Sequence, residues 1–90
     1  MLKIELVPDL THCIETVTKR EYEETLRCLL ATREGDQELK KRLELLSIFL
    51  ETVDFRKLRQ ESEKHLVEGR KVKFVFRLEG RTPKYEMITT

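Results

Sequence analysis

The chain has 90 residues, of which 39% are hydrophobic and 39% are charged, and its net charge is +1. This length fits one domain, residues 1–90, with a single modest core. The composition excludes a membrane-spanning helix, because no apolar run approaches the roughly 18 residues that such a helix needs.

The beginning of the chain and its cysteine content indicate a cytoplasmic protein. The opening "MLKIELVPD" lacks the cationic region and the long apolar stretch of a signal peptide. Cys13 and Cys28 are too few for a disulfide framework. Asn is absent and Gln occurs twice, a bias like that of hyperthermophile proteins, in which ionic networks increase and thermolabile amides decrease.

Residues 2–7 alternate between apolar and mostly charged side chains, which predicts a half-buried strand. Residues 10–17 leave two alternatives open, a short second strand or an irregular approach to the first helix. We expect that helix to begin at Thr18, an N-cap residue for which Glu21 completes a capping box. Gly35 should end it. Its apolar stripe is formed by Tyr22, Leu26, Leu29 and Leu30.

A second helix should begin at Asp36, another N-cap residue, and extend to residue 53. Its main apolar stripe is Leu39, Leu43, Leu46, Leu50 and Val53. Leu45, Ile48 and Phe49 lie outside that stripe, so the apolar arc covers more than half of the circumference. Such a helix is either central in its own domain or packed against another chain.

Asp54 either caps a third helix or marks a kink in one long helix. The inner face of the segment 54–68 would carry Phe55, Leu58, Ser62 and Leu66, and Gly69 should end it. Residues 71–79 then return to period-two alternation, and "GRTP" predicts a turn before a last strand. The order β-α-α-α-β-β predicts an α+β fold with three helices on one face of a small, mainly antiparallel three-stranded sheet.

Phe74 and Phe76 have the spacing of two aromatic side chains that stack on RNA bases. We expect them to be core residues instead. If they faced solvent, Lys73 and Arg77 would point into the core, and burying unpaired cations costs several kcal/mol each. With the strand turned the other way, Val72, Phe74, Phe76 and Leu78 cover the helical stripes.

The sequence shows no nucleotide-binding, zinc-protease or serine-hydrolase motif. His12, Cys13, Cys28 and His65 lack the paired spacing of a structural zinc site, so we expect neither a metal nor a cofactor. Cys28 should be a small, partly buried residue. A cysteine with His65 is the one nucleophile–base pair that the chain could assemble, with nothing to orient it. We therefore expect a protein that is not an enzyme.

The outer face of the sheet is the candidate for nucleic-acid contact, the alternative function. Basic side chains that could share this face are Lys3, Lys71, Lys73 and Arg77. Glu5, Glu79 and Glu86 would lie among them, and interleaved opposite charges are typical of an ordinary solvent-exposed sheet face.

The function that we favour is protein–protein interaction. The broad apolar arc suggests that Leu45, Ile48 and Phe49 form the centre of a homodimer interface, rimmed by Lys41 and Arg42. A different protein partner on the same surface is the alternative that the sequence leaves open.

Overall fold

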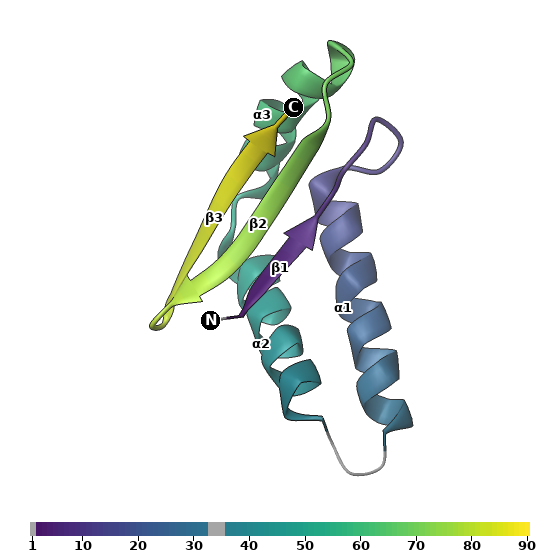
Figure 1. Cartoon of the computed structure of the whole chain (residues 1–90), viewed down its shortest axis with the longest axis vertical. Helices are drawn as coiled ribbons and strands as arrows, with labels where there is room; N and C mark the ends of the chain where they lie inside the picture. The colour runs from purple at the N-terminus through teal and green to yellow at the C-terminus, as the bar shows by residue number, and fades with distance from the viewer. Residues whose placement is uncertain (1, 33–35) are drawn as a thin grey trace.

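The computed structural model describes residues 2–32 and 36–90. Its elements are β1 (Lys3–Leu6), α1 (Ile14–Ala31), α2 (Gln37–Thr52), α3 (Phe55–Val67), β2 (Val72–Glu79) and β3 (Thr82–Thr89). The sheet has the order β1-β2-β3, with both neighbouring pairs antiparallel. The helices lie together on one face of this sheet (Figure 1). The predicted α+β class and element order are confirmed.

Helix α1 begins earlier than the sequence predicted. Its N-cap is Cys13, and residues 10–13 form an irregular approach in which Asp9 Oδ1 accepts hydrogen bonds from the backbone N–H groups of Thr11 and His12. Thr18 is buried inside the helix, where its hydroxyl donates to the Ile14 carbonyl at 2.7 Å. Because a threonine hydroxyl can be satisfied by the carbonyl four residues back, Thr18 does not mark the start of the helix.

The other end of α1 also differs from the prediction. Leu30 is 76% exposed, so it does not belong to the buried stripe, whereas Thr25 is buried. Glu21 does not cap the helix; its Oε1 accepts a hydrogen bond from Arg42 of α2 at 3.0 Å. The helix ends at Ala31, and the predicted stop at residue 35 lies outside the described residues.

Helices α2 and α3 are two separate helices, each with an aspartate N-cap. Asp36 Oδ1 accepts from two backbone N–H groups at the start of α2. Asp54 Oδ1 does the same at the start of α3, which decides between the two alternatives for this position. These bonds satisfy donors that have no partner within the helix. Phe55, Leu58 and Ser62 of the predicted inner face of α3 are buried, and Leu66 is half-buried against the core.

The core lies between the helices and the inner face of the sheet. Phe74 and Phe76 on β2 are both 0% exposed, which confirms their orientation towards the helices. Ile4 of β1 is paired with Phe76 and is also buried. The ring of Phe49 stacks on that of Phe76 with centroids 4.1 Å apart and planes 3° from parallel. Helix α2 is therefore the central helix, packed against both α1 and the sheet.

Two glycines with positive φ fix the route of the chain around β2. Gly69 (φ 83°) follows the end of α3, and Gly80 (φ 64°) is the first of two residues that connect β2 to β3. Glycine adopts such angles without the steric cost that a Cβ atom brings. A glycine at this position of a two-residue loop suits the twist of a β-hairpin, so β2 and β3 pair along their full length.

Candidate functional site

The structure corrects the predicted interface on α2. Leu45 is 1% exposed and Phe49 is 0% exposed, because both pack in the core. Ile48 is half-buried, and Arg42 is engaged with Glu21. Lys41 is exposed. The broad apolar arc thus reflects the central position of α2 within its own domain, and Leu45 and Phe49 are not available to a partner. The homodimer itself stays a prediction.

The outer face of the sheet carries the predicted mixture of charges. Lys73 lies 3.6 Å from Glu5, and Arg77 contacts both Glu79, at 3.1 Å, and Glu86. Arg77 donates hydrogen bonds to Glu86 and to Glu79. Both bonds raise the pKa of its guanidinium, and the bond to Glu86 has the larger effect. Two of the four cations proposed for nucleic-acid contact are therefore paired with carboxylates.

The other two cations, Lys3 and Lys71, are exposed. Val75 lies between the paired charges on the same face and is only 7% exposed. Opposite charges across neighbouring strands stabilise a solvent-exposed face, and carboxylates beside the cations oppose the binding of phosphate. This arrangement favours an ordinary surface over a nucleic-acid interface.

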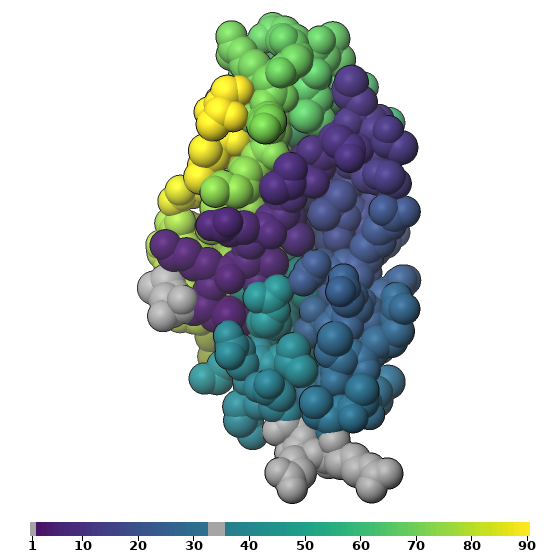
Figure 2. Space-filling view, turned by 45° about the vertical axis from the view of Figure 1, so that its right-hand side comes forward, coloured from purple at the N-terminus to yellow at the C-terminus, as the bar shows by residue number. Residues whose placement is uncertain are grey.

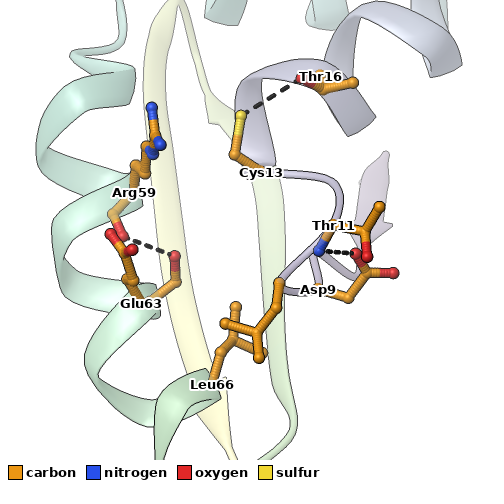
Figure 3. A pocket seen from close by; sticks show the side chains of 9 residues that line it. Asp9, Thr11, Cys13, Thr16, Arg59, Glu63 and Leu66 are labelled. Carbon is orange, nitrogen blue, oxygen red and sulfur yellow. Dashed lines mark hydrogen bonds between the residues drawn. The ribbon is translucent and has the colours of Figure 1, made fainter.

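A small pocket of about 160 Å³ lies between the start of α1 and α3 (Figure 3). Cys13 and Arg59 stand on opposite sides of it. Cys13 Sγ lies 3.3 Å from Thr16 Oγ1. The hydrogen bond with the Thr16 side chain lowers the pKa of the Cys13 thiol most strongly. A hydrogen bond with the Thr16 backbone lowers it further, and the charge of Arg59 adds a smaller effect. Thiolate is the nucleophilic form of cysteine.

The residues of the predicted cysteine–histidine pair are not brought together in this pocket. Its lining residues are Asp9, Leu10, Thr11, Cys13, Thr16, Arg59, Ser62, Glu63 and Leu66. His65 is therefore not part of the lining, and its buried Nδ1 has no hydrogen-bond partner within the described residues. Cys28 is exposed on α1, not partly buried as predicted.

The four soft side chains do not form a metal site either. His12 Nδ1 lies 3.5 Å from Asp9. In residues 2–32 and 36–90, no group of three or more histidine, cysteine, aspartate or glutamate side chains is arranged to hold a metal ion. Over the same residues, none of the helices is both long and apolar enough to cross a bilayer.

The free edge of β3 is the candidate site that the sequence did not reveal. Lys71 and Thr90 exchange two backbone hydrogen bonds, N–H of each to C=O of the other, at 3.2 and 3.0 Å. In an antiparallel pair, such hydrogen-bonded positions alternate with positions whose groups point away. Residues 82, 84, 86 and 88 therefore bond to β2. The backbone groups of Pro83, Tyr85, Met87 and Thr89 point outwards.

Nothing in the described part of the chain pairs with these outward groups. Within residues 2–32 and 36–90, no strand follows β3 in the sheet, and none of the hydrogen bonds outside helices and strands involves the backbone of residues 83–89. Figure 2 shows β1 lying against α1, and α1 therefore flanks one edge of the sheet. Strand β3 borders the molecule at the opposite edge.

The side chains beside this edge are partly apolar. Tyr85 and Met87 face the helices, are half-buried and pack against the core, with the Tyr85 ring centroid 6.3 Å from that of Phe74. On the outer face Ile88 is 39% exposed, and Lys84 and Glu86 are exposed between Thr82 and Ile88. An eight-residue edge strand of this kind is a template for pairing with another strand.

One signal in the sequence could have pointed to this edge. Pro83 lacks the N–H group that a strand with neighbours on both sides must donate, so proline occurs on edge strands with its nitrogen facing away from the sheet. The structure places Pro83 at such an outward position, which agrees independently with the alternation deduced from Lys71 and Thr90.

Of three comparisons with known proteins, only the comparison with family models found a match. No curated protein and no solved structure matches the chain. A family model covers residues 2–86, which include every element from β1 to most of β3. The chain belongs to this uncharacterised protein family.

Proposed function

We propose that this protein is a non-enzymatic protein–protein interaction module that self-associates through the free edge of β3. The observation that carries the proposal is the row of outward backbone groups at Pro83, Tyr85, Met87 and Thr89, deduced from the register of β2 and β3. A further strand added there would pair these groups with hydrogen bonds. This is β-strand addition, a common mode of protein recognition.

The rest of the molecule supports a role in binding protein more than a role in catalysis. The pocket beside Cys13 has a thiol of lowered pKa, but no histidine lines it to act as a base. The cations of the outer sheet face are interleaved with Glu5, Glu79 and Glu86. We also propose a cytoplasmic location, since both cysteines are free and thiols persist in a reducing compartment.

Self-association is tested by sedimentation of the purified protein from micromolar to millimolar concentration, together with amide hydrogen exchange. We expect a concentration-dependent dimer. In the monomer the N–H groups of Tyr85 and Met87 exchange rapidly because they face water, whereas those of Glu86 and Ile88 are protected by β2. On association, Tyr85 and Met87 should become protected.

A matched pair of variants at Met87 separates the backbone from the side chain. Met87→Ala removes the thioether but keeps the outward N–H group. Met87→Pro removes that N–H group as well, without breaking a bond to β2, and its ring obstructs an incoming strand. We expect the proline variant to dissociate at least tenfold more readily than the alanine variant. Equal association of the two, or a wild type that stays monomeric, refutes the proposal.

A further inference from the structure

We infer that two copies of the chain pair their β3 strands antiparallel about a two-fold axis at Tyr85, and that Lys84 and Glu86 determine this register. The inference rests on the proposed function, because it specifies how the β3 edge meets a second copy. The charge pattern of the edge, read together with the register of β2 and β3, leads to this axis.

The backbone limits the registers that are available. Two edges pair when outward-pointing groups face outward-pointing groups, so residues 83, 85, 87 and 89 must oppose one another. With the axis at Tyr85, each Tyr85 N–H group donates to the Tyr85 carbonyl of the second copy. Each Met87 N–H group donates to the Pro83 carbonyl of the second copy. The missing N–H group of Pro83 leaves these four bonds intact.

The charged side chains distinguish this register from its neighbours. With the axis at Tyr85, Lys84 lies directly opposite Glu86 of the second copy, and the two-fold axis produces this pair twice. Both positions are then non-hydrogen-bonded pairs, in which the side chains approach most closely. With the axis at Lys84 or Glu86, that residue faces the same residue of the second copy, so two like charges lie opposite each other. With the axis at Met87, Glu86 faces Ile88.

Both charged residues are available for such a contact. Lys84 is exposed and takes part in none of the ion pairs formed by residues 2–32 and 36–90. Glu86 contacts Arg77 through Oε1, and its side chain is 56% exposed. Glu86 would therefore lie between Arg77 of its own copy and Lys84 of the second copy, so that each side of the axis has one carboxylate in contact with two cations.

The inner face of the edge is compatible with the same axis. The half-buried Tyr85 would face Tyr85 of the second copy, and Met87 would face Pro83. Opposed residues in a sheet share a face, so the helices of both copies would cover the same side of one six-stranded sheet. Apolar surface that the monomer leaves partly exposed would be covered on association.

Charge exchange at positions 84 and 86 tests the register. In a K84E homodimer, the glutamates at positions 84 and 86 of the two copies lie opposite each other in both pairs. In an E86K homodimer, two lysines lie opposite each other in both pairs. We expect the dissociation constant of each single variant to rise about tenfold or more, since like charges directly opposite each other destabilise a sheet. The double variant K84E/E86K restores both pairs and should return to within about threefold of the wild type.

An equimolar mixture of K84E and E86K provides the sharpest readout. Each pair across the axis then joins a glutamate from one variant to a lysine from the other, so the mixture should form a heterodimer more tightly than either variant forms a homodimer. Sedimentation, with one variant carrying a fluorescent label, measures this preference. Slow hydrogen exchange at the N–H group of Ile88, which bonds to β2, shows that both variants keep the pairing of β2 with β3.

The outcomes separate this inference from the proposed function. A K84E variant that associates as tightly as the wild type, or a mixture with no preference for the heterodimer, refutes the Tyr85 axis. If Tyr85 and Met87 are nevertheless protected on association, the edge proposal stands with another register. A wild type that remains monomeric at millimolar concentration refutes both.

Discussion

Replacing Phe49 by alanine should destabilise the folded chain by about 4 kcal/mol, because this change removes a ring from the centre of the core. Phe49 is 0% exposed, and its ring stacks on that of Phe76 with centroids 4.1 Å apart. Substitutions of a buried phenylalanine by alanine cost about 3–5 kcal/mol, and the loss of an aromatic pair contributes about 0.5–1.5 kcal/mol. A chain of this length has a total stability of about 5–13 kcal/mol.

Urea unfolding at low micromolar concentration measures this effect. With an m value of about 1.5 kcal/mol/M, the loss lowers the unfolding midpoint by roughly 2–3 M. Leu30→Ala is the matched control on a residue that is 76% exposed, and it should change stability by less than about 0.5 kcal/mol. If Phe49 belonged to an interface between chains, its replacement would change the oligomeric state and leave the monomer stable. A loss below about 1 kcal/mol would refute its place in the core.

Two further predictions concern the thiol of Cys13 and the glycines with positive φ. Cys13 should react with iodoacetamide faster than the exposed Cys28 near neutral pH, because its lowered pKa increases the thiolate fraction; Thr16→Val should slow Cys13 alone, and equal rates for both thiols would contradict the role of this hydrogen bond. Gly69→Ala should destabilise the fold by about 1–2 kcal/mol and Gly69→Asn by less, since a Cβ atom opposes φ 83° although it would meet no other atom within 4 Å. Chemical unfolding measures both glycine variants, and equal effects of alanine and asparagine would argue against backbone strain at this position.

Local signals in the sequence were reliable where one side chain satisfies the backbone by itself. Asp36 and Asp54 cap α2 and α3 as expected, because a carboxylate oxygen accepts the N–H groups that a helix start leaves free. Thr18 carries a similar signal and was misleading. Its hydroxyl has an alternative acceptor inside the helix, the carbonyl of Ile14, so a capping-box pattern fits both a helix start and a helix interior.

Periodicity predicted which side chains are buried better than it predicted what buries them. The alternation in residues 71–79 oriented Phe74 and Phe76 correctly, because turning the strand over would have buried Lys73 and Arg77. The apolar arc of α2 was equally clear, but Leu45 and Phe49 are buried in the chain's own core. A pattern within one helix contains no information on how much surface the other elements cover, so it could not separate a central helix from an interface.

The edge of β3 depends on information that no single segment of the sequence contains. Alternation assigns side chains to the two faces of a sheet, whereas the direction of each N–H group depends on pairing with a neighbouring strand. That pairing is set by the two-residue turn at Gly80 and by the bonds between Lys71 and Thr90. Pro83 was the one local indication that β3 has a free side. The candidate site therefore consists of backbone groups whose exposure follows from strand order, and the role in recognition that we propose for Lys84 and Glu86 depends on their position beside that edge.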